Sequence, residues 1–78
     1  MMYEAMITTT VISQMKPNDR LRIARVLARL TQLQLANMVG LKESDISRIE
    51  TGRTVANCET KERIARALDK PTFELFQA

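Results

Sequence analysis

The sequence predicts an all-α protein in which five short helices form one compact domain and an extended arm precedes them. Apolar residues recur at intervals of three and four along residues 17–78, which is the pattern of amphipathic helices. Proline and glycine separate these stretches, at positions where helices begin and end. Residues 7–12 are all β-branched, which favours an extended strand within an N-terminal arm of residues 1–16.

The arm has three alternative arrangements, because a lone strand is not stable by itself. It pairs with the same strand of a second subunit, adds to the edge of another protein, or stays a flexible segment. The sequence does not choose among these arrangements.

The chain is small for a stable domain, since 78 residues bury only about 60% of the surface that the unfolded chain exposes. Its one cysteine, Cys58, and the absence of histidine exclude an internal disulfide and a Cys/His zinc site. No metal or cofactor is expected. Oligomerisation is the remaining way to stabilise so small a core, and we therefore expect a homodimer.

The first helix is expected to begin at Pro17, because the missing N–H of proline costs nothing in a first helical turn. The Asn18 and Asp19 side chains can accept hydrogen bonds from the exposed amides of that turn. The expected core face of this helix consists of Leu21, Ala24, Leu27 and Ala28.

Two further short helices follow the first one. Thr31 is a suitable cap for a helix over residues 32–39, which ends at Gly40. The next helix is predicted from about Glu43 to Thr51. Its expected inward residues are Ile46 and Ile49, and Gly52 is its expected stop.

A fourth helix, capped by Asn57, is predicted to extend through Leu68, and Pro71 opens a last short turn. Three apolar side chains of this turn either form a subunit interface or pack onto the core of their own chain: Phe73, Leu75 and Phe76.

The positive charge of the chain is concentrated in one region. Residues 17–53 hold seven basic and four acidic side chains, so the whole net charge of +3 lies there. Local basicity of this kind is expected of a protein that binds a polyanion. No apolar run approaches the roughly 20 residues of a membrane span, and the first residues lack the basic start of a secretory signal. We expect a soluble, cytoplasmic protein with no membrane partner.

The predicted helices over 32–39 and 43–51 are joined by a short turn that contains glycine, so they are expected to cross steeply. Close approach of the two backbones requires a small residue in the first helix, which Ala36 provides. The turn requires a residue that tolerates positive φ, which Gly40 provides. The second helix requires a branched apolar anchor, which Ile46 provides.

These features occur in the run TQLQLANMVGLKESDISRIETGR, which resembles the helix-turn-helix of the phage repressor and Cro proteins, the XRE family. Arg22 and Arg25, upstream, and the run KERIARALDKPTFELF, downstream, resemble the first, fourth and fifth helices of the same family. The resemblance covers about residues 18–76. It implies a lambda-repressor-like fold and binding of double-stranded DNA.

The resemblance implies that the helix over 43–51 enters the major groove, where each base pair presents a distinct pattern of donors and acceptors. Arg48 is suited to donate two bonds to guanine, and Glu43 to accept from the amino group of cytosine. The residues that match the family's reading positions are Lys42, Glu43, Ser44, Ser47 and Arg48.

Three residues match positions that meet the phosphate backbone in the family: Gln32, Arg53 and Asn57. Asn57 has the alternative role of a helix cap. Arg25 and Glu50 match a pair that often forms an internal ion pair in the family, and we interpret both as structural.

The favoured function is that of a dimeric transcriptional repressor, with two recognition helices about 34 Å apart on a palindromic operator. An antitoxin that binds both its toxin and operator DNA is the main alternative, with the arm of residues 1–16 gripping the toxin. A protein-interaction module without DNA binding is a third class, suggested by Glu43 and Asp45. An enzyme is disfavoured because the chain has no histidine, no Gly-rich phosphate loop and no evident pair of catalytic carboxylates.

Overall fold

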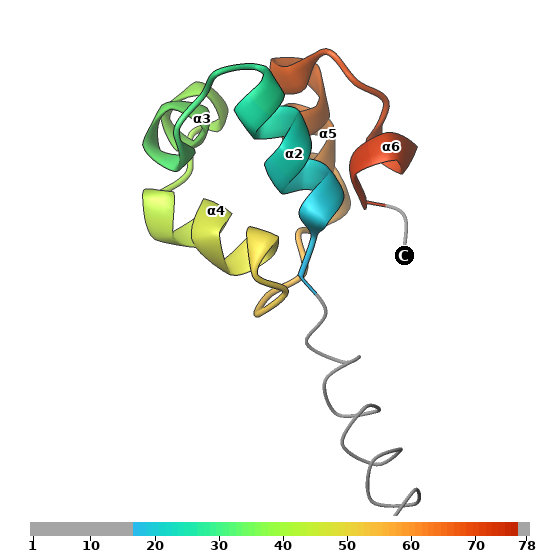
Figure 1. Cartoon of the computed structure of the whole chain (residues 1–78). Coiled ribbons are helices and arrows are strands. Elements are labelled where there is room, and N and C mark those ends of the chain that lie inside the picture. Colours follow the sequence, from blue (N-terminus) through green and yellow to red (C-terminus); the bar gives the residue numbers. More distant parts are fainter. Residues whose placement is uncertain (1–16, 77–78) are drawn as a thin grey trace, which may run out of the picture.

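The computed structural model of the chain describes residues 17–76, and this part is built of helices joined by short turns (Figure 1). The five helices are α2 (Asp19–Leu27), α3 (Gln32–Val39), α4 (Glu43–Glu50), α5 (Cys58–Leu68) and α6 (Thr72–Phe76). The described residues contain no strand. The predicted all-α fold class is therefore confirmed for this part of the chain.

The helices enclose one small core. Helix α3 packs most extensively against α4 and also against α5, while α6 packs against α2 and α5. In Figure 1, α2 crosses the front of the domain, with α3 and α4 on one side of it and α6 on the other. The side chains at the centre of the core are fully buried: Leu21, Leu35, Ile46, Ile64 and Leu75.

Side-chain caps fix where three of the helices begin. The Oδ1 atom of Asn18 accepts from the Leu21 N–H at 3.0 Å and starts α2. Thr31 and Gln34 form a capping box at the start of α3, in which each side chain bonds the backbone N–H of the other residue. Asn57 caps α5 by accepting from the Thr60 N–H at 2.8 Å.

The core face predicted for the first helix is partly wrong. Leu21 is buried and Ala24 is half-buried, but Leu27 is 77% exposed and Ala28 is also exposed. The helix ends at Leu27, and Arg29 takes a left-handed conformation that turns the chain away. Arg25 is half-buried on the inward side instead, because a buried partner neutralises its charge.

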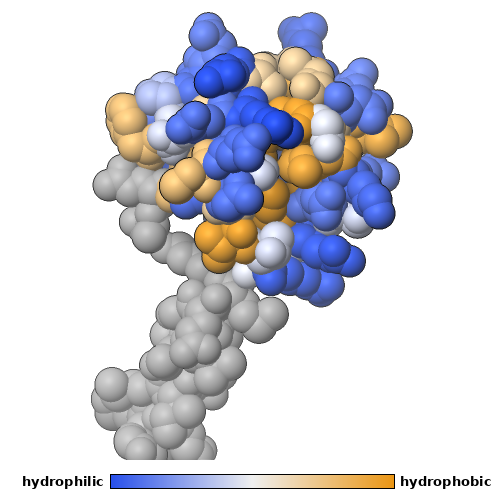
Figure 2. All heavy atoms as spheres, turned by 180° about the vertical axis from the view of Figure 1, so that it is seen from behind, coloured by the Kyte–Doolittle hydropathy of each residue, from blue (hydrophilic) through white to orange (hydrophobic). Residues whose placement is uncertain are grey.

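Of the three C-terminal apolar residues, two pack onto the core of their own chain and one is exposed. Leu75 is buried in the core and Phe76 packs against it, with the Lys61 Nζ atom 5.7 Å from the centre of its ring. Phe73 is 63% exposed. Figure 2 shows the face on which α5 lies, where hydrophobic side chains form small patches among hydrophilic ones.

The predictions made for residues 1–16 lie outside the described residues. These are the extended arm, its strand pairing and its role in gripping a toxin. None of the helices within residues 17–76 has the length and apolar character needed to cross a bilayer.

Candidate DNA interface

The two central helices meet as their residue types predict. Leu35 and Ala36 of α3 and Ile46 of α4 have no exposed surface and belong to the same hydrophobic core, and α3 packs closely against α4. Gly40 ends α3 in a left-handed conformation, with φ of 74°, and the chain turns into α4 after two more residues. This turn holds α4 across α3 with one side of α4 away from the core.

We expect Gly40→Ala to lower the free energy of unfolding by about 1–2 kcal/mol, because a Cβ atom strains a left-handed backbone. The new methyl group meets no close neighbour, since the nearest atom, Nη1 of Arg63, lies 4.0 Å away. Backbone strain is therefore the only source of the loss. Asp69→Gly is the matched reverse change, because Asp69 also has positive φ, of 55°, where glycine is unstrained. Urea unfolding should show a lower free energy of unfolding for Gly40→Ala and a higher one for Asp69→Gly. Changes of the same sign in the two variants would contradict this account.

The side of α4 that points away from the core is polar. Ile46, Ile49 and Glu50 are buried, whereas Ser44 and Arg48 are exposed on the opposite side of the helix. Lys42 and Glu43, at the N-terminal end of α4, are also exposed. Ser47 is half-buried at the edge of this surface, so it is less accessible than Ser44 and Arg48.

The second acidic residue of this helix has a structural role. Asp45 is half-buried, and its Oδ2 atom accepts from the Lys42 N–H at 3.1 Å, at the start of α4. A carboxylate in the first turn also interacts favourably with the helix dipole. The Asp45 carboxylate is thus used at the start of α4. Its negative charge is therefore only a weak argument against DNA binding.

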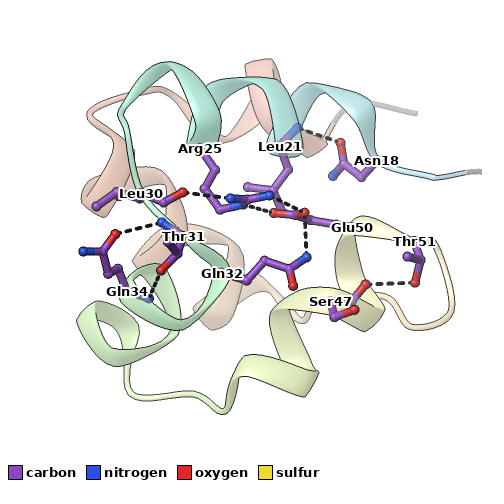
Figure 3. Close-up of polar contacts among 10 residues, drawn as sticks. All are labelled: Asn18, Leu21, Arg25, Leu30, Thr31, Gln32, Gln34, Ser47, Glu50 and Thr51. Atoms are coloured by element: carbon purple, nitrogen blue, oxygen red, sulfur yellow. Dashed lines mark hydrogen bonds and ion pairs between the residues drawn. The ribbon is translucent and has the colours of Figure 1, made fainter.

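A buried ion pair joins α2 to α4 (Figure 3). Arg25 Nε lies 2.5 Å from Glu50 Oε2, and Arg25 Nη2 donates to Glu50 Oε1 at 3.1 Å. The side chains are only 11% and 3% exposed. Arg25 Nη1 also donates to the carbonyl oxygen of Leu30 at 2.8 Å, and the Asn18 N–H donates to the carbonyl oxygen of Glu50 at 2.8 Å. The pair therefore fixes the C-terminal end of α4 against α2.

Gln32 lies where α3 begins, but its side chain has a contact that the sequence did not suggest. Its Nε2 atom donates to Glu50 Oε1 at 3.0 Å, so Gln32 joins the ion pair as its third member. Gln32 and Glu50 are 18 residues apart and on different helices, and no local motif signals such a contact. The Thr31–Gln34 capping box, in contrast, is readable from the spacing Thr-x-x-Gln.

The remaining two predicted phosphate contacts lie in the segment after α4. Arg53 is exposed, and its backbone N–H donates to the Arg48 carbonyl oxygen at 2.9 Å, which ties this segment to the end of α4. Asn57 is exposed too, but its Oδ1 atom is used to cap α5. Its amide nitrogen is the part that can face a phosphate.

A comparison with protein families decides what this arrangement is. The family described as "Helix-turn-helix domain" matches residues 19–72, which is more than half of the chain. The chain belongs to this family. It is a helix-turn-helix protein that binds DNA and regulates transcription, as the resemblance to the XRE family predicted.

A solved structure supports the same assignment for this helix-turn-helix protein. The crystal structure of the restriction-modification controller protein C.AhdI from Aeromonas hydrophila is similar to it, with a TM-score of 0.72 and 34% sequence identity. The similarity covers 76% of this chain and 86% of that one. No curated protein sequence compared with the chain matches it.

The helix-turn-helix surface offers charged and hydrogen-bonding groups. Within residues 17–76, no three acidic or cysteine side chains come together in a group that would hold a metal ion. The groups that α4 presents are suited to contact base edges and phosphates directly.

Proposed function

We propose that the protein is a dimeric transcriptional regulator that binds a palindromic operator, with α4 in the major groove of each half-site. The observation that supports this most directly is the polar outward side of α4, where Ser44 and Arg48 are exposed while Ile46 and Ile49 anchor the helix. A helix held in this way can enter the groove without losing its packing.

The proposed readers of bases are Lys42, Glu43, Ser44, Ser47 and Arg48, and the proposed phosphate contacts are Gln32, Arg53 and Asn57. Arg48 is the main candidate because its exposed guanidinium can donate two bonds to guanine. Arg53 is suited to the backbone because it lies just beyond α4, in a segment hydrogen-bonded to it.

Repression and dimerisation are both part of this proposal. The similarity to a restriction-modification controller protein favours a regulator of that kind. We propose repression as the mode of action of the present protein. The small core gives a second subunit a stabilising role. Phe73, which is 63% exposed on α6, is a candidate for the subunit contact.

We expect Arg48→Ala and Arg53→Ala to weaken DNA binding in different ways. The operator is first selected from random duplex DNA with the purified protein. Arg48→Ala should then lose about 1–3 kcal/mol of discrimination at one base position, because a bidentate contact to one base is removed. Arg53→Ala should weaken binding to all sequences alike and reduce the dependence of log K on log salt by about one unit.

Arg66→Ala is the matched control, because Arg66 is exposed on α5 and outside the proposed interface. It should preserve the sequence preference. An unchanged preference in Arg48→Ala would remove Arg48 from the readers, and failure of the unaltered protein to bind any duplex would reject the proposed function as a whole.

A further inference from the structure

The hydrogen bond between Gln32 and Glu50 has a defined polarity. Glu50 is paired with Arg25 and is an ionised carboxylate, which can only accept hydrogen bonds. The atom of Gln32 that faces it at 3.0 Å is therefore the amide nitrogen Nε2. Figure 3 shows Oε1 of Gln32 on the other side of the amide, pointing away from Glu50.

An amide nitrogen carries two N–H groups, and this contact uses one of them. Gln32 is half-buried at the first position of α3, the part of the helix-turn-helix proposed to approach the DNA backbone. The second N–H therefore remains to donate to another acceptor. A phosphate oxygen is an acceptor of the right kind.

The first N–H holds the amide on a rigid support. Glu50 is bound by Arg25 through two hydrogen bonds, and Arg25 is in turn bound to the carbonyl oxygen of Leu30 at 2.8 Å. A glutamine side chain without such a support loses rotamer freedom when it binds a ligand. Here part of that freedom is already lost when the domain folds, so binding a phosphate causes a smaller further loss.

We propose that Glu50 is a positioning residue for DNA binding, which holds the amide of Gln32 so that its second N–H donates to a phosphate. This inference rests on the proposed approach of α3 to the DNA backbone. It gives the buried ion pair a second role beside fixing the helices, because the pair then contributes to DNA affinity through Gln32.

The test compares Gln32→Leu in two backgrounds: the unaltered protein and the double variant Arg25→Met/Glu50→Leu. The double variant replaces the buried pair by apolar side chains and leaves no charge unpaired, so the domain should still fold. Affinity for a non-specific 20-base-pair duplex is measured by fluorescence anisotropy. Gln32→Leu should weaken binding about threefold to tenfold in the unaltered protein, which corresponds to one hydrogen bond. In the double variant, the same change should alter affinity by less than about twofold.

An equal loss in both backgrounds would show that Gln32 acts without Glu50 and would overturn the inference. No loss in the unaltered protein would overturn it as well, because Gln32 would then be structural only. Either result still requires that the protein binds the duplex, so failure of the inference is distinct from failure of the proposed function.

NMR of the unaltered protein provides a measurement that does not depend on folding of the double variant. The two Nε2 protons of Gln32 are assigned by their absence from Gln32→Leu. In the free protein one proton should be protected from exchange with water by Glu50. Adding the duplex should protect the second proton and leave the first protected. If the first proton loses its protection on DNA binding, or the second is unaffected, Glu50 does not position the amide.

Discussion

Glu50→Ala is expected to destabilise the domain by about 3–5 kcal/mol, because it leaves the charge of Arg25 buried without a counter-ion. Only 11% of the Arg25 side chain is exposed, so water cannot replace the carboxylate. The change also removes the acceptor of the Gln32 amide. Small domains have total stabilities near the lower end of 5–15 kcal/mol, so a loss of this size removes most of the free energy of unfolding. Urea unfolding followed by circular dichroism measures it.

Glu59→Ala is the matched control for this prediction. It removes the same type of side chain from an ion pair that is also short, with Arg63 Nη2 and Glu59 Oε2 2.7 Å apart. These side chains are 53% and 72% exposed, and ion pairs exposed to water contribute less than about 1 kcal/mol. If the two variants lost equal stability, the burial of the Arg25–Glu50 pair would not be the reason for its importance.

Leu35→Ala is expected to lower the free energy of unfolding by about 2–5 kcal/mol. Leu35 has no exposed surface and lies in α3, which packs against α4 and α5, so its removal opens a cavity in the core. The loss should appear as a lower urea midpoint with an unchanged slope. Each kcal/mol should lower the melting temperature by roughly 4–8 °C in a domain of this size.

Leu27→Ala makes the same chemical change at a position that is 77% exposed. It should change stability by no more than about 0.5 kcal/mol, because little apolar surface is lost from contact. The sequence pattern alone placed Leu27 in the core, so this variant separates that prediction from the structure. A loss comparable with that of Leu35→Ala would mean that Leu27 is covered in solution.

The sequence alone determined the elements that depend on neighbouring residues. The helix predicted over residues 32–39 is α3, and the helix predicted from Glu43 to Thr51 is α4, which ends one residue earlier at Glu50. Caps and stops such as Asn57 and Gly40 act on backbone groups within a few residues of themselves. Local chemistry of this kind is readable from the order of residues, and so is the family resemblance that rests on it.

The family resemblance indicated the Arg25–Glu50 pair, but only the tertiary structure decided that Leu27 is exposed and that Gln32 contacts Glu50. Hydrophobicity favours Leu27 over Arg25 as an inward residue, but the carboxylate of Glu50, 25 residues further along the chain, makes burial of Arg25 favourable. The same carboxylate binds the amide of Gln32. These arrangements depend on partners that folding brings together from three different helices, and the energy of a buried charge depends on such partners rather than on its neighbours in the sequence.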